Sequence, residues 1–203
     1  MNNGLFVAEN YLKEEYKLNV NRTRLLCVLV LIIAGLIFGL PFFVLWHNNL
    51  MFSQENGQLE LYRRLINIGL FIIVVLIGII THELLHGFFA AIFNKNGFKS
   101  IKFGVMLSKG MAYCVNAEIL KTNKYIIGLI MPLIILGIIP SILSVLIGNL
   151  YFFIFGLLFI VAASGDIVLL AQIYKGRHDS WVEDMVSGSE VKIFIYRPKK
   201  MDI

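Results

Sequence analysis

The sequence predicts an all-α polytopic membrane protein with about four transmembrane helices and a small β-hairpin between the second and the third. Three observations predict this fold class. The 203 residues are 58% hydrophobic and only 15% charged, whereas an average soluble domain is about 45–50% apolar and about 25% charged. Four apolar runs are each long enough to cross a hydrocarbon core of ~30 Å. One polar loop alternates apolar and polar residues with the period of two that is typical of a β-strand.

The expected spans are four apolar runs at residues 25–46, 65–93, 125–147 and 150–174. The first run contains no charged residue and ends in Trp46, and tryptophan is enriched where a membrane helix reaches the interface. The third run contains Pro132 and Pro140. A proline inside a helix removes one hydrogen bond and leaves a backbone carbonyl free, so we expect kinks there.

Polar segments separate and flank these runs. Residues 1–24 have a weak amphipathic face and are interpreted as a short interfacial helix, with a disordered tail as the alternative. Residues 47–64 form a polar loop, and residues 175–203 form a polar tail in which the apolar stretch 191–196 is a candidate strand. The predicted organisation is therefore an N-terminal segment (1–24), a membrane core (25–174) and a tail (175–203).

The hairpin is expected in the basic loop 94–124. Ile101, Phe103, Val105 and Leu107 alternate there with more polar or smaller residues, which indicates a strand. The sequence Ser108-Lys109-Gly110 is typical of a turn, and residues 111–117 could form the returning strand. Open sheet edges are not tolerated against lipid, so we expect this hairpin at the membrane face.

The distribution of basic residues predicts the topology. Loop 47–64 holds two lysines or arginines, whereas loop 94–124 holds six, the N-terminal segment four and the tail six. Positive-inside counting places both termini and loop 94–124 in the cytoplasm, for a protein of the cell membrane. The net charge of +5 therefore reflects topology, and we expect the lipid bilayer and no nucleic acid as a partner.

The sequence His82-Glu83-Leu84-Leu85-His86 places three ionisable side chains inside the second apolar run. Two histidines at i and i+4 lie on one face of a helix, one turn apart, so both can bind one metal ion. The adjacent Glu83 can act as general base toward a water at that metal. A catalytic zinc site needs a third protein ligand, which the motif does not supply.

Asp166 is the candidate third ligand because of its depth. His86 lies eight residues before Asn94, and Asp166 lies nine residues before Lys175. At ~1.5 Å per residue both side chains are roughly 12–14 Å from the cytoplasmic end of their spans. An acid inside a membrane span is a functional hypothesis by default. The alternative is a structural hydrogen bond between helices.

The chain resembles a family of short intramembrane zincin metallopeptidases without appended domains, which is similar to the site-2 protease class. The resemblance covers about residues 65–175 and rests on His82–Gly87, Gly110–Cys114, Pro132 and Gly165-Asp166. In site-2 proteases the third zinc ligand is an aspartate in a Leu-Asp-Gly context, whereas Asp166 is preceded by Gly165 and followed by Ile167. The resemblance further implies that the hairpin binds a substrate strand by β-augmentation, with Phe103 and Tyr113 as candidate contacts.

These observations predict an integral-membrane zinc endopeptidase that cleaves a membrane-embedded protein near the cytoplasmic face. His82, His86 and Asp166 would hold one Zn²⁺ per chain, and Glu83 would be the catalytic base. The alternatives are a non-catalytic metal-binding membrane protein, a transporter, and a catalytically silent relative that binds proteins. Transport favours a path of several ligand clusters, and the sequence has a single one. Cys27 and Cys114 form no disulfide or metal-binding pattern.

Overall fold

We describe a computed structural model, which covers residues 11–16, 20–51, 58–106, 111–174, 179–187 and 190–199. The chain divides into two compact units, one of residues 1–23, 83–132 and 165–203, and the other of residues 24–82 and 133–164. One division falls within the long helix α4 (Gln58–Phe93), between His82 and Glu83. We call these the motif unit, which contains Glu83 and His86, and the helical unit.

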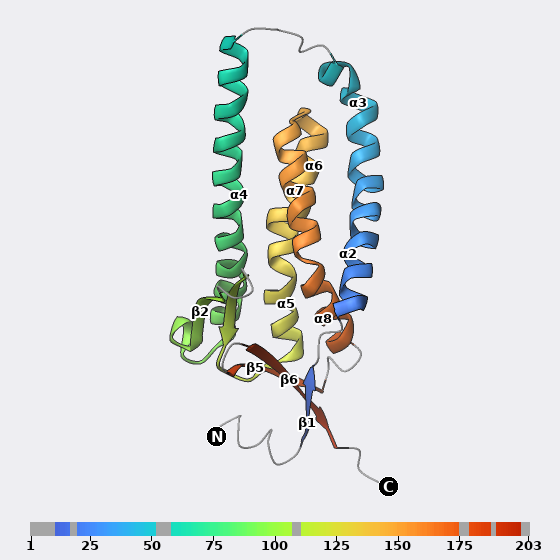
Figure 1. Cartoon of the computed structure of the whole chain (residues 1–203). Coiled ribbons are helices and arrows are strands. Elements are labelled where there is room, and N and C mark those ends of the chain that lie inside the picture. Colours follow the sequence, from blue (N-terminus) through green and yellow to red (C-terminus); the bar gives the residue numbers. More distant parts are fainter. Residues whose placement is uncertain are drawn as a thin grey trace. The chain divides into compact units, whose positions relative to one another are not determined.

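The helical unit consists of apolar helices, as the sequence predicts. Besides the first part of α4 (Figure 1), it contains most of α2 (Val20–Ala34) and the elements η1 (Gly35–Gly39), α3 (Leu40–Met51), η3 (Leu133–Ile138), α6 (Ile139–Ile147) and α7 (Leu150–Ala162). Both η1 and η3 are π-helical turns beside a proline, Pro41 and Pro140. A proline lacks the N–H that closes a regular helical turn, and a π-turn is one way in which a helix adapts to that loss.

Aromatic side chains hold α3 against α6 and α7 in the helical unit. The rings of Phe42 and Phe153 stack with centroids 4.7 Å apart. Trp46 donates its indole N–H to the carbonyl of Val145 at 2.9 Å, which satisfies a carbonyl in the last turn of α6. Gly148 ends α6 with φ +70°, a conformation that glycine adopts without steric cost.

The motif unit combines helices with two small sheets. Its helices are the end of α4, the 3-10 turn η2 (Gly97–Ser100), α5 (Thr122–Pro132) and α8 (Ser164–Tyr174). The strands are β1 (Tyr11–Tyr16), β2 (Ile101–Met106), β3 (Met111–Asn116), β4 (Leu120–Lys121), β5 (Trp181–Ser187) and β6 (Glu190–Pro198). Strands β2 and β3 form an antiparallel hairpin, and the other four form a sheet of order β1-β6-β5-β4.

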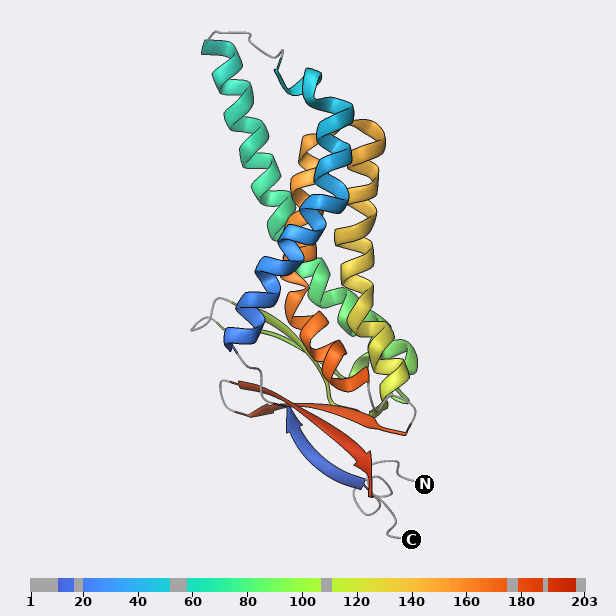
Figure 2. The same ribbon diagram turned by 90° about the vertical axis from the view of Figure 1, so that its right-hand side faces the viewer.

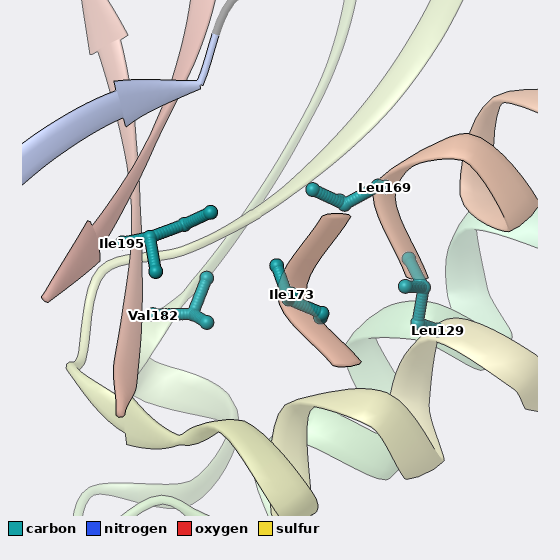
Figure 3. Packing of buried hydrophobic residues seen from close by; sticks show 5 residues of the cluster. All are labelled: Leu129, Leu169, Ile173, Val182 and Ile195. Atoms are coloured by element: carbon teal, nitrogen blue, oxygen red, sulfur yellow. The ribbon is translucent and has the colours of Figure 1, made fainter. Parts of the chain in front are cut away.

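The four-stranded sheet joins the two ends of the described chain. Figure 2 shows the N-terminal strand β1 beside the C-terminal strands, and Tyr11 pairs with Pro198 at one end of that ladder. Val182 and Ile195 from this sheet pack with Leu129 of α5 and with Leu169 and Ile173 of α8 (Figure 3). This cluster is the hydrophobic core of the motif unit.

Several helices meet the length and composition of membrane spans. Among the described residues these are Thr23–His47, Glu60–Phe93 and Thr122–Ile147. Helices α7 and α8 meet at an angle of 43° and give a fourth span if they act as one. The expected fourth span, 150–174, is therefore broken at Ala163. The expected loop 47–64 was too long, because α3 and α4 extend into it from both sides.

The fold class needs a correction, because strands extend beyond the predicted hairpin. The hairpin itself is confirmed in residues 101–106 and 111–116, while the expected turn at 108–110 lies outside the described residues. The candidate strand at 191–196 is confirmed as part of β6. The expected interfacial helix in residues 1–24 was wrong over Tyr11–Tyr16, which form β1. Tyrosine suits a pleated strand, and the partner β6 supplies the pairing that the local pattern could not reveal.

Candidate metal site

Helix α4 carries the whole His-Glu-x-x-His motif on regular helical turns. His82 is buried, with an exposed fraction of 8%, and its ring stacks on Phe159 with centroids 6.2 Å apart. Phe159 fits there because Gly78, one turn before His82, has no side chain: a Cβ at Gly78 would lie 2.5 Å from the nearest atom of the Phe159 ring. The ring of His82 is therefore packed against the aromatic ring of Phe159.

His86 is oriented by a backbone carbonyl of the neighbouring helix α5. Its Nδ1 atom lies 2.9 Å from the carbonyl oxygen of Gly128, so the Nδ1–H donates and Nε2 keeps its lone pair. In a regular helix this carbonyl would accept from the N–H of residue 132, and that residue is Pro132, which has none. The proline thus leaves a carbonyl free in the place where His86 needs an acceptor. A backbone carbonyl is a common orienting partner of metal-binding histidines.

Asp166 approaches His86 from a third helix. It lies in the first turn of α8, where the helix dipole favours a carboxylate. Its Oδ2 atom is 3.5 Å from Nε2 of His86. A charge-assisted hydrogen bond would be shorter, at about 2.7–2.9 Å. Two ligands of one tetrahedral zinc, with bonds of about 2.0–2.2 Å, would lie roughly 3.4 Å apart.

His82 completes the group. Because α4 is continuous through residues 82 and 83, His82 stands one turn before His86 in the same helix. With the 3.5 Å approach of Asp166 to His86 in the motif unit, these three side chains are the candidate ligands of one metal ion. Two imidazole nitrogens and one carboxylate oxygen are a donor set that catalytic zinc uses. The side chains therefore fit a zinc ion by chemistry and by spacing.

The hairpin packs on α4 immediately after the motif. The side chains of Phe103 and Ile101 of β2 lie over Gly87, and a Cβ at Gly87 would come within 2.8 Å of Phe103 and within 2.9 Å of Ile101. Tyr113 is placed differently, because it pairs with Gly104 and covers that glycine. Successive residues of a strand point to opposite faces. The candidates Phe103 and Tyr113 therefore lie on opposite faces of the hairpin, and Phe103 is on the face toward α4.

Glu83 lies close to the strand β3. It is half-buried, and its charge, after burial itself, helps to raise the pKa of the Cys114 thiol to about 12, with a further contribution from Asp184. A thiol with this pKa stays protonated at neutral pH, so Cys114 is a poor nucleophile. The glutamate therefore remains the candidate base beside the histidines.

Asp184 is a buried acid that the sequence interpretation missed. It accepts a hydrogen bond from the hydroxyl of Tyr125 in α5 at 2.9 Å and one from the backbone N–H of Asn116 in β3 at 3.3 Å. One carboxylate thus joins β5 to the hairpin and to the helix that carries Gly128. The signal was present in the sequence, since Asp184 stands two residues from both Val182 and Val186 and so shares the apolar face of a strand pattern.

Residues 75–181 match a protein family described as "Putative zincin peptidase". The matched stretch is more than half of the chain and includes the motif, the hairpin and Asp166. The chain belongs to this family. Its zincin motif is His82-Glu83-Leu84-Leu85-His86, and membership of a zincin family implies zinc and a metallopeptidase. Searches among curated proteins and among solved structures returned no match.

Proposed function

We propose that this zincin-family protein is an integral-membrane zinc endopeptidase that hydrolyses a peptide bond of a membrane-associated protein near the cytoplasmic face. The observation that carries the proposal is the approach of Asp166 to His86, with Oδ2 at 3.5 Å from Nε2, next to Glu83 and one helical turn after His82 in α4. These three side chains come from α4 and α8, which are distant in sequence. If the two histidines had this spacing by chance, there would be no reason for an acid from another helix to lie beside them.

His82, His86 and Asp166 would hold one zinc ion per chain. When bound, zinc supplies Lewis acidity, which lowers the pKa of water and polarises a carbonyl. The hydrogen bond from His86 to Gly128 fixes the tautomer that leaves Nε2 available, and the Phe159 ring limits rotation of His82. The carbonyl of Gly128 and the ring of Phe159 thus hold the two histidines in position.

Glu83 would act as the general base and then the general acid. Its carboxylate takes the proton of the attacking water and delivers it to the nitrogen of the leaving amine. Its place supports this assignment, because it is adjacent to His82 in α4 and half-buried.

The substrate would bind as an extended strand along the hairpin. Strand β2 pairs with β3 on one side, and in the described part of the chain no strand pairs with its other side. Phe103 of the same strand packs on Gly87, one residue after His86. A peptide added to the edge of β2 would therefore lie near the motif, with its peptide bonds exposed. This mode of binding is the one that the resemblance to the site-2 protease class implies.

The depth of the motif and the distribution of basic residues support hydrolysis near the cytoplasmic face. His86 lies seven residues before Phe93, the end of α4, or roughly 10 Å along the helix. Positive-inside counting assigns that end to the cytoplasm, and the helices are long and apolar enough to span a bilayer. Water and an unfolded juxtamembrane segment of the substrate can both approach from that side.

The decisive experiment compares the wild type with Glu83→Gln. Both proteins are purified in detergent, assayed for bound zinc, and coexpressed with a single-span reporter that has an unfolded cytoplasmic juxtamembrane segment. We expect about one zinc per chain in both proteins and cleavage only with the wild type. The change removes the base and leaves the three ligands unchanged.

Two results would contradict the proposal. Cleavage that persists in Glu83→Gln would mean that another group activates the water. Zinc flux into vesicles that contain the wild type, absent with His86→Ala, together with no cleavage of any reporter, would support the alternative of a transporter.

A further inference from the structure

A basic groove in the motif unit has no part in the proposed hydrolysis. Its cavity volume is about 540 Å³. Three lysines, Lys95, Lys121 and Lys124, line it together with the rings of Phe93 and Trp181. The residues come from the end of α4, the start of α5 and strands β4 and β5, so the groove is built by several elements of the motif unit.

The aromatic rings hold two of these cations at the groove. The Nζ atom of Lys121 lies 5.6 Å from the centroid of the Trp181 ring, and that of Lys124 lies 5.6 Å from the centroid of Phe93. Within the part of the chain that the structure describes, none of the three lysines forms an ion pair with a carboxylate. All three residues are exposed, so their ammonium groups can bind an anion.

The two acids that line the groove are already satisfied. Glu118 accepts hydrogen bonds from the backbone N–H groups of Lys95 and Asn96 at 2.9 and 3.0 Å, and also from the Ser100 hydroxyl. These donors keep the pKa of Glu118 below its ordinary value despite the opposing effect of partial burial. Glu183 is paired with Lys13 at 3.3 Å and accepts from the Tyr196 hydroxyl at 2.6 Å. With Lys13 counted, four ammonium groups face two carboxylates, so the site has net positive charge.

The groove lies at the ends of two candidate membrane spans. One span ends at Phe93 and another begins at Thr122, while Lys95, Lys121 and Lys124 lie within two residues of those ends. Lysines next to the ends of spans reach the phosphate layer of a bilayer. Tryptophan is likewise enriched at this level.

We propose that the basic groove binds the phosphate of an anionic phospholipid of the cytoplasmic leaflet. Basic pockets beside membrane helices on the cytoplasmic side recognise such headgroups. The lysines pair with the phosphate, and Phe93 and Trp181 contact the glycerol region and the upper acyl chains. This proposal rests on membrane insertion as described above, and it does not depend on hydrolysis.

The test measures lipid binding to the purified full chain without added zinc. Native mass spectrometry in neutral detergent compares phosphatidylglycerol with phosphatidylcholine of the same acyl chains. The variant Lys121→Gln/Lys124→Gln removes two groove cations. The matched control Lys99→Gln/Lys102→Gln removes two exposed cations of the same loop that do not line the groove. Each lysine near the surface contributes about fivefold, so we expect the groove variant to bind phosphatidylglycerol at least tenfold more weakly, the control less than twofold, and phosphatidylcholine unchanged.

Three outcomes would overturn the assignment. One is that the groove variant and the control lose phosphatidylglycerol binding to the same extent. Another is displacement of the lipid by glycerol phosphate at equal concentration, which would indicate a soluble phosphate ligand. The third is a combination of results. The wild type in phosphatidylcholine nanodiscs binds a soluble acidic peptide and shows no preference for phosphatidylglycerol, and the groove variant loses the peptide binding. It would assign the groove to the protein substrate. The variant Lys121→Arg/Lys124→Arg should retain lipid binding.

Discussion

His86 donates its Nδ1–H to the carbonyl of Gly128 at a distance of 2.9 Å, and that carbonyl is free because residue 132 is a proline. The missing N–H of a proline in α5 thus allows a backbone carbonyl to orient a candidate metal ligand. Pro132 thus helps to orient His86, because an alanine there would offer an N–H that competes for the same oxygen.

Pro132→Ala should weaken zinc binding without removing any ligand. The restored N–H of residue 132 bonds to Gly128, so His86 loses its fixed tautomer. Loss of a hydrogen-bond partner that orients a metal ligand costs about 10–100-fold in metal affinity, and we expect a value near the lower limit. Competition with a chromogenic chelator measures the affinity. Pro140→Ala is the matched control, because it alters a helix proline in the helical unit. Equal affinities of the two variants would contradict the role of Pro132.

Asp166→Asn should remove the third ligand while keeping the shape of the side chain. A neutral amide binds zinc poorly, and we expect the zinc affinity to fall by more than about 100-fold, since loss of a group that only orients a ligand already costs about 10–100-fold. The same chelator competition applies, with Glu83→Gln as the variant that keeps all three ligands. Undiminished affinity and activity in Asp166→Asn would mean that the third ligand is another group.

Much of the helical architecture could be predicted because the apolar runs are long and the signals are local. The motif at residues 82–86 and the alternation in 101–106 each occupy consecutive positions, so periodicity reveals them. The depth of Asp166 could be compared with that of His86 because helical rise is constant. The expectation depended on a continuous fourth span, and the bend at Ala163 did not prevent Asp166 from reaching His86.

The four-stranded sheet could not be predicted, since its pairings depend on contacts between distant segments. Tyr11 and Pro198 are partners in that sheet, and no local pattern records such a pairing. The role of Gly128 was hidden for a related reason. Sequence indicates that Pro132 frees a carbonyl, but only the packing of α5 on α4 shows which side chain uses it. Asp184 had a local signal, because it is an acid at an apolar position of a strand pattern. Its partners Tyr125 and Asn116 could be identified only from the fold.

Gly87→Ala should displace the hairpin and lower activity while zinc affinity is retained. The new methyl group would overlap Phe103 and Ile101, and overpacking of this kind costs about 1–3 kcal/mol. Cleavage of the reporter and chelator competition measure the two effects. Adding Phe103→Ala should restore part of the activity by making space. Gly165→Ala is the control, because no atom lies within 4 Å of a Cβ at Gly165. Equal activity of both glycine variants would contradict the packing argument.

Asp184 should make the stability of the motif unit depend on pH. Burial raises the pKa of its carboxyl from 3.8 to about 6, although the hydrogen bonds from Tyr125 and Asn116 oppose the increase. The folded chain therefore binds this proton more tightly than the unfolded chain does. The stabilisation is complete below pH ~4 and is lost as the pH rises through ~6, so the free energy of unfolding should fall by about 1 kcal/mol between pH ~5 and ~7. Thermal unfolding in detergent with a chelator measures it. Asp184→Asn should lower the unfolding temperature at pH ~5 and reduce the slope with pH, whereas an unchanged slope would assign the dependence to other groups.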